Sequence, residues 1–297
     1  MDGPLVSFVI LSYNRRDVLG NAIASAARQR YPHKEIIVVD NGSTDGTMAY
    51  LEEEAQGIRY LSLWQNMGLP VARNEGIRAA KGDIFIFMDD DCVLENESSV
   101  DLVVSQFAAD GDCGAIAFRI LDPKTRREWP YGLHNGPHAP VAYESILFRG
   151  GGVAMRREML NDVGLFWDPL FIVHEDTDLS LRMAAKGWRI MARSDIVILH
   201  PAPAVNATPN ARREVYFKVR NTIWLAIKLM PVSMMAGFML PVFARSLNLA
   251  VRTGRITFFI RAIVDGMRGM SRCLHERRPV SRAWVDRARQ LHMRLWT

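Results

Sequence analysis

The sequence predicts an α/β fold in which helices cover a mostly parallel sheet, and two observations support this prediction. Over the first 120 residues, short apolar runs rich in β-branched side chains alternate with longer amphipathic stretches. That alternation is typical of parallel strands joined by crossover helices. Residues 35–39 and 84–88 are apolar almost without interruption, as strands that are covered on both faces should be.

The individual elements follow in chain order. Strands are predicted at residues 7–11, 35–39, 58–63 and 84–88. Between the first two strands, a helix is predicted because apolar residues recur at helical spacing, namely Val18, Leu19, Ala22, Ile23 and Ala26. A second helix is predicted at residues 70–81, which begin with a proline and stop before Gly82.

The middle of the chain is less regular. Residues 121–150 are rich in Pro, Gly and His, which predicts a long connection near the site. Order resumes at residues 153–162, followed by a helix at 175–186 that ends before Gly187 and an apolar strand at 196–199.

Charge divides the chain into two regions. Residues 212–297 hold 17 Lys and Arg against 4 Asp and Glu, whereas the whole chain holds 37 and 32. The net charge is therefore −8 over residues 1–211 and +13 over the remainder. We expect a catalytic domain at residues 1–210 and a basic, Met- and Arg-rich helical tail at residues 211–297.

The cysteines and the apolar segments bear on location. Cys92, Cys113 and Cys273 are far apart and form no Cys-x-x-Cys pair, so a reducing cytoplasm is the expected compartment. No basic leader precedes the first apolar run, and no signal peptide is expected.

Residues 229–244 carry no charge over 16 residues, fewer than the ~20 needed to span a bilayer. Association at the inner membrane face is therefore expected instead.

Polar residues follow several predicted strands, where ligands of an open parallel sheet bind. They are Ser12, Tyr13 and Asn14 after the first strand, Asp40 and Asn41 after the second, Asp89, Asp90 and Asp91 after the fourth, and His200 after a later one. The Asp40 segment has two interpretations. It is either a turn with a helix cap at Ser43, Thr44 or Asp45, or a site at which Asp40 accepts a hydrogen bond from a nucleobase or ribose.

The aspartate triplet favours a metal site, because three adjacent carboxylates repel one another unless a cation is bound. A solvated acidic turn is the alternative. Oxygen ligands suit Mg²⁺ or Mn²⁺, which usually take further ligands from phosphates and water. The triplet therefore predicts a diphosphate substrate.

Taken together, these motifs resemble glycosyltransferase family 2. The resemblance covers about residues 5–205. It is carried by the segments at residues 9–15, 39–47, 66–76 and 87–91, and then by those at 150–157, 167–168 and 174–182. It implies the GT-A fold, a Rossmann-like nucleotide-diphospho-sugar transferase domain, and inverting transfer of a sugar to an acceptor hydroxyl.

The resemblance also implies roles for individual residues. Binding of the nucleotide sugar falls to Ser12, Tyr13, Asn14, Asp40, Asn41, Arg73, Asp89, Asp90, Gly151, Gly152 and Arg220. The metal ligands would be Asp89, Asp91 and His200, although a buried imidazole at a strand end is the plain alternative for His200. Trp167 and Glu175 would lie on the acceptor side, and Asp176 would be the catalytic base. Alternatively, the acids at 175–178 merely favour the first turn of a helix.

The expected partners are a nucleotide diphosphate sugar and a saccharide or lipid-linked acceptor, with a rhamnosyl- or hexosyl-type transfer in cell-envelope or exopolysaccharide synthesis. A non-catalytic nucleotide-sugar-binding scaffold is one alternative. A processive polysaccharide synthase is another, but the family's Gln-x-x-Arg-Trp motif is missing. No motif for nucleic-acid binding is present.

The tail has two interpretations. Arg245, Arg252, Arg255, Arg261, Arg268 and Arg272 interleave with Leu, Ile and Phe, which suits an anionic membrane surface. A helical lid or an arm of a homo-oligomer would show the same pattern.

Overall fold

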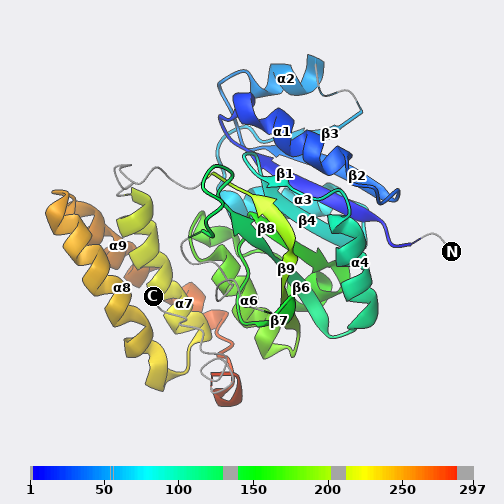
Figure 1. The fold of residues 1–297 in the computed structure, drawn as a ribbon. Coiled ribbons are helices and arrows are strands. Elements are labelled where there is room, and N and C mark those ends of the chain that lie inside the picture. The colour runs from blue at the N-terminus through cyan, green and yellow to red at the C-terminus, as the bar shows by residue number, and fades with distance from the viewer. Residues whose placement is uncertain (1–2, 54, 56, 130–139, 202–211, 286–297) are drawn as a thin grey trace. The chain divides into compact units, whose positions relative to one another are not determined.

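The computed structural model describes residues 3–53, 55, 57–129, 140–201 and 212–285. The chain forms two compact units (Figure 1). The first contains Met1–Phe171 and Trp188–Pro203, and the second contains Ile172–Gly187 and Ala204–Thr297. The boundary expected at residue 210 lies outside the described residues. Residues 172–187, which the sequence places in the catalytic domain, cluster with the C-terminal helices.

The first unit is built on one mixed sheet, which confirms the predicted α/β class. Its strand order is β3-β2-β1-β4-β8-β6-β9-β5, and β7 pairs with β9. The pairs β1–β2, β1–β4, β2–β3 and β6–β9 are parallel, and the other pairs are antiparallel. The strands are β1 (Val6–Ser12), β2 (Lys34–Asp40), β3 (Arg59–Ser62), β4 (Ile84–Asp89), β5 (Val93–Leu94), β6 (Cys113–Leu121), β7 (Ala142–Ser145), β8 (Gly152–Arg156) and β9 (Arg189–Leu199).

Helices cover both faces of this sheet. They are α1 (Arg16–Ala27), α2 (Thr47–Glu53), α3 (Leu69–Ala79), α4 (Ser99–Ala109) and α5 (Arg157–Val163), with a short turn η1 (Asp168–Leu170). On one face, Leu19 of α1 and Val103 of α4 are buried in a cluster with Ile10 of β1. On the other face α3 approaches so closely that a Cβ on Gly76 would collide with Val9. Successive residues of β1 therefore contact different helix layers.

The expected strands agree with β1 to β4 to within one or two residues, whereas β6 was not predicted. This strand contains Gly114 and two alanines, which favour strands weakly. It forms because it is buried between β8 and β9. The connection expected at residues 121–150 also contains a strand, β7, and residues 130–139 of it lie outside the described residues.

The second unit is helical. Its elements are α6 (Glu175–Ala185), η2 (Arg212–Phe217), α7 (Lys218–Leu229), α8 (Val232–Arg252), α9 (Ile256–Arg268) and α10 (Met270–His275). Helix α7 is buried along most of its length and packs against α6, α8, α9 and α10. Gly266 of α9 contacts Ile223 of α7, and Trp224 donates a hydrogen bond to the Gly266 carbonyl at 3.0 Å.

Helix α8 corrects one argument made from the sequence. The charge-free stretch of residues 229–244 is short, but the helix continues to Arg252 and has 21 residues. By length and composition alone, it could cross a membrane. One side of α8 nevertheless packs inside the second unit. Its buried residues are Phe238, Val242, Ser246 and Ala250.

Candidate active site

The register of the central strands brings three predicted residues to one edge of the sheet. Ser12 is paired with Asp40 at the ends of β1 and β2, and Leu11 is paired with Asp89 at the ends of β1 and β4. Parallel strands end at the same edge, so the side chains that follow them lie close together. The segments that follow β1, β2 and β4 are thus neighbours at one edge of the sheet.

The three aspartates after β4 have different partners. Asp90 is buried, and its carboxylate accepts the backbone N–H of Tyr13 at 3.1 Å. Asp91 contacts Nε2 of His200 at 3.0 Å and Nη1 of Arg15 at 3.7 Å. Asp89 lies 3.6 Å from Nη2 of Arg73. The triplet is therefore integrated into the first unit, and the alternative of a solvated acidic turn does not describe it.

Burial and mutual repulsion alter the protonation of this cluster. Burial raises the pKa of Asp90 to about 7, and the charges of Asp89 and Asp91 add to the rise. Burial also raises the pKa of Asp91, but the hydrogen bond and charge of His200, together with Arg15, hold it below its ordinary value. Burial lowers the pKa of His200, yet the hydrogen bond to Asp91 and the charges of the triplet outweigh this and raise it.

The residues present fit a divalent cation. Asp89, Cys92 and His200 each offer a ligand atom, and these atoms lie within 4.8 Å of one another. Carboxylate and imidazole ligands suit Mn²⁺ or a similar ion. His200 would have to give up the proton that it shares with Asp91 to become a ligand. Of the predicted ligands, Asp89 and His200 belong to this group, and Asp91 is in contact with it through His200.

Cys92 was not predicted as part of the site. Its thiol is fully buried and donates a hydrogen bond to the Gly151 carbonyl at 3.2 Å. Burial raises the pKa of this thiol well above its ordinary value, and the three aspartates add to the rise. The buried thiol of Cys92 therefore lies beside Asp89 and His200 and is oriented by Gly151. In the sequence, the position of Cys92 directly after the aspartate triplet was the one signal that it lies near the site.

His200 is held on its other side by Trp129. The two rings stack with centroids 4.2 Å apart, and the indole N–H donates to the His200 carbonyl at 2.8 Å. Trp129 belongs to the stretch expected to be irregular, and nothing in its sequence context pointed to this contact.

Asp40 is fully buried at the end of β2. Its carboxylate accepts the Ser43 N–H at 3.3 and 3.2 Å and the Ser62 hydroxyl at 3.4 Å. The hydroxyl of Ser12 is also buried, and it has no hydrogen-bond partner among the described residues. A buried hydroxyl without a partner is costly, so a ligand group at this position would stabilise it.

The loop after Asp40 is tied down by several polar contacts. Asn41 donates to Asn66 and to the Gly68 carbonyl, both at 3.3 Å, and accepts the Met67 N–H at 2.8 Å. Asp45 accepts the Thr47 N–H at 3.1 Å at the start of α2. Asp45 thus holds the start of α2, as the turn-and-cap interpretation expects, and the binding of a nucleobase or ribose by Asp40 stays a prediction.

Tyr13 and Asn14 follow β1 on the same edge. Tyr13 is 44% exposed. The side chain of Asn14 accepts the Thr44 N–H at 2.7 Å, and its backbone adopts a positive φ of 54°. Asparagine tolerates this conformation better than most residues, which explains its presence at this position.

Arg73 extends from α3 towards Asp89. Its side chain is 1% exposed, and its guanidinium lies 5.3 Å from the ring centroid of Phe166. A Cβ on Gly150 would collide with that guanidinium, and a Cβ on Gly151 would lie 2.6 Å from a carboxylate oxygen of Asp89. A Cβ on Gly152 would lie 2.9 Å from Ile198. The three glycines thus leave room for the side chains of Arg73, Asp89 and Ile198, which a Cβ at each position would displace. A role of these glycines in binding the donor sugar stays a prediction.

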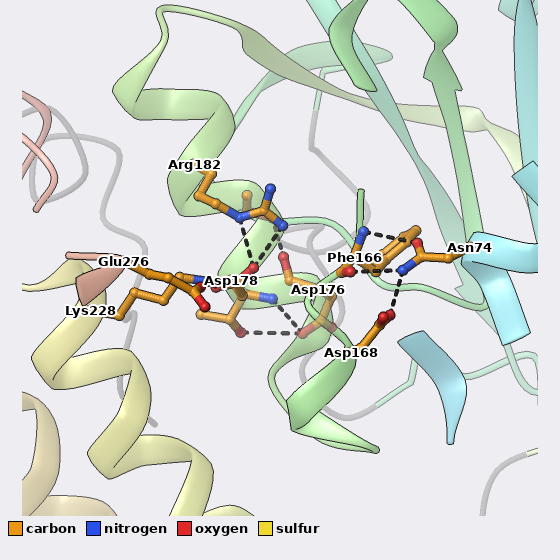
Figure 2. Close-up of polar contacts among 10 residues, drawn as sticks. Asn74, Phe166, Asp168, Asp176, Asp178, Arg182, Lys228 and Glu276 are labelled. Carbon is orange, nitrogen blue, oxygen red and sulfur yellow. Dashed lines mark hydrogen bonds and ion pairs between the residues drawn. The ribbon is translucent and has the colours of Figure 1, made fainter. Parts of the chain in front are cut away.

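The segment containing Trp167 is fixed to α3. Asn74 donates to the Phe166 carbonyl at 2.8 Å and to Asp168 at 2.7 Å, and it accepts the Phe166 N–H at 3.0 Å (Figure 2). Trp167, which is half-buried, lies between these two anchored residues. Asn74 lies in the segment 66–76 that carries the family resemblance, but its anchoring role was not predicted.

In the second unit, Glu175 and Asp176 begin α6, as expected. Glu175 is buried and Asp176 is half-buried. The Asp176 carboxylate accepts the backbone N–H of the next residue, Thr177, at 2.7 Å. Acidic residues in this first turn are favoured by the helix dipole. That explanation and a catalytic role are compatible.

Arg220 lies inside the second unit rather than on its surface. Its guanidinium carbon lies 5.4, 4.9 and 4.2 Å from the ring centroids of Tyr216, Phe217 and Trp224. Its Nε donates to the side chain of Asn221 at 2.9 Å. Burial lowers the pKa of Arg220. The predicted contact with a diphosphate stays a prediction.

A family model described as glycosyl transferase family 2 matches residues 7–164, more than half of the chain. The chain belongs to this family. Among curated proteins, it is 26% identical over 234 residues to the O-antigen biosynthesis protein RfbC of Myxococcus xanthus, which covers 70% of this chain. It is 28% identical over 182 residues, or 56% of the chain, to the cholesterol galactosyltransferase of Borreliella burgdorferi. It is 40% identical over 91 residues, or 30% of the chain, to the protein of Bacillus subtilis named putative teichuronic acid biosynthesis glycosyltransferase TuaG.

These relatives are longer proteins. The family 2 chain spans 18%, 47% and 36% of their respective lengths. Their similarity therefore concerns a shared domain.

Solved structures support the GT-A fold. The mannosyltransferase PcManGT of Pyrobaculum calidifontis, in complex with GDP-Man and Mn²⁺, has a TM-score of 0.62 at 18% identity and covers 98% of this chain and 84% of its own. TarS 1-349 of S. aureus, in complex with UDP-GlcNAc, has a TM-score of 0.62 at 18% identity over 92% of this chain and 84% of its own. At these identities the likeness is one of fold.

Proposed function

We propose that this family 2 chain transfers a sugar, with inversion, from a nucleotide diphosphate sugar to an acceptor hydroxyl, using a divalent cation. The observation that carries the proposal is the convergence of Ser12, Asp40, Asp89 and the Asp91–His200 pair at one edge of the sheet. Solved relatives of the same fold hold GDP-Man with Mn²⁺ or UDP-GlcNAc, which supports a nucleotide sugar as donor.

Within this proposal, the first unit binds the donor. The buried Ser12 hydroxyl and the Asp40 carboxylate hold the nucleoside, with Tyr13, Asn14 and Asn41 beside them. Arg73 supplies a buried positive charge near the diphosphate, next to Asp89. When bound at Asp89, Asp91 and His200, Mg²⁺ or Mn²⁺ would neutralise the charge of the departing diphosphate.

The acceptor is activated by Asp176, which would accept the proton of the attacking hydroxyl. Asp176 lies half-buried in the first turn of α6, and a carboxylate is a suitable group for general-base catalysis. Trp167 and Glu175 would contact the acceptor. In-line attack on the anomeric carbon, opposite the leaving diphosphate, inverts its configuration.

The acceptor class follows from the relatives. Proteins similar to this chain are named for O-antigen and teichuronic acid biosynthesis, so we propose a saccharide or lipid-linked acceptor in cell-envelope glycan synthesis. Transfer of rhamnose or a hexose fits this context. The three buried thiols, Cys92, Cys113 and Cys273, are consistent with a cytoplasmic enzyme.

We also propose that the second unit contacts an anionic membrane surface. Helices α8 to α10 expose large apolar residues, including Leu240, Val251, Ile260 and Met267, which are 64%, 65%, 56% and 61% exposed. Exposed arginines accompany them at positions 245, 252, 255, 261, 268 and 272. Apolar and basic side chains on the same helices suit an interfacial location, and this favours a membrane over a purely solvated arm.

A thermal-shift and turnover panel tests the donor assignment. UDP-, GDP- and dTDP-sugars are added with and without Mn²⁺, and we expect one of them to raise Tm more strongly with the metal, because a ligand stabilises the fold it binds. The same sugar should release nucleoside diphosphate when acceptor glycosides are added. Stabilisation without release would support the scaffold alternative, and no stabilisation by any member would refute donor binding.

A further inference from the structure

The segment that leads into α6 has an unusual backbone. Phe171, Val173 and His174 have positive φ angles of 63°, 71° and 71°. A β-branched residue such as Val173 rarely adopts this region, because its side chain crowds the backbone. Such a conformation persists only where the surrounding structure holds it. Asp176 follows this segment by two residues.

One side chain of the second unit holds the segment directly. Asn221 of α7 is fully buried, and its amide donates to the carbonyls of Ile172 at 2.8 Å and Val173 at 2.7 Å. Its own oxygen accepts the Nε–H of Arg220 at 2.9 Å. Both donors of one amide thus bind successive carbonyls of the strained turn, while Arg220 fixes the orientation of that amide.

A second contact from α7 supports the same turn. His174 Nε2 lies 3.1 Å from the Thr222 hydroxyl, which itself donates to the Lys218 carbonyl at 2.7 Å. Because the only proton of that hydroxyl is already used, His174 must be the donor. Further along, Lys228 of α7 pairs with Asp178 of α6 at 2.9 Å (Figure 2). Three residues of α7, namely Asn221, Thr222 and Lys228, therefore contact α6 or the turn that precedes it.

We propose that Asn221 is a positioning residue for catalysis, which holds the 172–174 turn so that Asp176 keeps a fixed place and angle within the second unit. This inference rests on the proposed role of Asp176 as the base. A carboxylate displaced by about 1 Å can lose roughly 10²-fold in rate, so the turn needs a rigid support. The basic tail would then be a working part of the transferase, in addition to any contact with a membrane.

The test compares Asn221→Asp with wild type and with Asn248→Asp, the same chemical change at an exposed position of α8. Asn221→Asp keeps the shape of the side chain but removes both donors. We expect kcat to fall by about 10- to 100-fold with little change in KM for the donor sugar found in the panel. Amide hydrogen exchange over residues 172–178 should become faster in this variant only.

Two further variants keep the test decisive. If Asn221→Asp does not fold, Asn221→Ser retains one donor and should show a smaller loss of kcat. Val173→Gly removes the Cβ that opposes the positive φ, so in this background the Asn221 substitution should cost several-fold less. Strictly additive losses would contradict the proposal, since contacting residues that act together are coupled.

The outcomes separate this inference from the proposed function. Unchanged kcat and unchanged exchange in Asn221→Asp would overturn the positioning role while the transferase stands. A wild-type protein that shows no turnover with any donor would remove the proposed function. Hydrogen exchange would then still decide whether Asn221 holds the turn.

Discussion

Lys228 of α7 and Asp178 of α6 form a buried ion pair in the second unit, with Nζ 2.9 Å from the carboxylate and side chains that are 5% and 0% exposed. Arg182 contacts the same carboxylate at 2.7 Å, and Glu276 lies 3.7 Å from the lysine. Opposite charges balance within this cluster, so it can be buried. It also joins α6, which begins at Glu175, to α7 of the tail.

Replacement of Lys228 by methionine should destabilise the protein. Among the described residues, the substitution leaves the buried Asp178 with Arg182 as its one cationic partner. Removing one member of a buried pair typically costs about 3–5 kcal/mol. Denaturant unfolding monitored by circular dichroism measures the loss. Lys81→Met, at an exposed position of the first unit, is the matched control and should change the midpoint little.

Asp91→Asn should weaken both metal binding and turnover. Loss of one carboxylate from the cluster removes a negative charge that favours a cation, and we expect kcat to fall by about 10²–10³-fold. Calorimetric titration with Mn²⁺ in the presence of the donor sugar measures binding separately. Asp17→Asn, on the exposed side of α1, should behave as wild type. Full Mn²⁺ affinity in Asp91→Asn would show that this residue is not needed for the metal.

Asp176→Asn should lower kcat by about 10²–10⁴-fold, the usual cost of losing a general base. The KM for the donor should change little, because the substitution preserves size and removes only basicity. Initial rates at saturating donor and acceptor test this expectation. Asp101→Asn, an exposed change on α4, serves as the control. Retention of full turnover by Asp176→Asn would exclude it as the base.

Glu35 should contribute to the loss of stability in acid. Its carboxylate accepts hydrogen bonds from the Ser7 hydroxyl at 2.6 Å, from the Lys81 N–H at 2.6 Å and from Arg59 at 2.9 Å. Burial raises its pKa, but these hydrogen bonds and the charge of Arg59 outweigh burial and hold the pKa below its ordinary value.

The direction of the pH effect follows from this lowered pKa. The unfolded state binds the proton more tightly, so the stabilisation is present above the unfolded pKa and is lost as pH falls through the folded one. Glu35→Gln should therefore be less stable than wild type near pH 7, and the difference should shrink in acid. Thermal unfolding over a pH series would show it. A difference that does not depend on pH would contradict this assignment.

Substitution of three tail arginines should weaken binding to anionic vesicles. Arg252, Arg255 and Arg272 are exposed, and each cation near such a surface contributes about 1 kcal/mol. The triple change to glutamine should therefore lower the partition coefficient by roughly 10²-fold. Flotation with phosphatidylcholine vesicles that contain phosphatidylglycerol provides the measurement. The control changes Arg28, Arg30 and Arg78 of the first unit to glutamine, and equal flotation of both variants would remove the membrane proposal.

Much of the fold was predictable, because the apolar segments of the sequence are the strands and helix faces that the fold buries. Strands β1, β2 and β4 contain apolar runs that end in polar residues, and α3 begins near a proline and ends before a glycine. Strand β6 could not be predicted in this way, because its small residues form a strand only between two neighbours distant in sequence.

The sequence by itself determined that Asp40, the aspartate triplet and His200 follow strands, and parallel pairing then brings such positions to one edge. It did not determine which carboxylate meets which partner. Only the tertiary structure decided that the carboxylate of Asp90 accepts the Tyr13 N–H, whereas that of Asp91 contacts His200. It also decided that Asn221 binds the turn before Asp176. The physical reason is that strand and helix periodicity are local properties, whereas hydrogen-bond partners far apart in the chain are selected by packing.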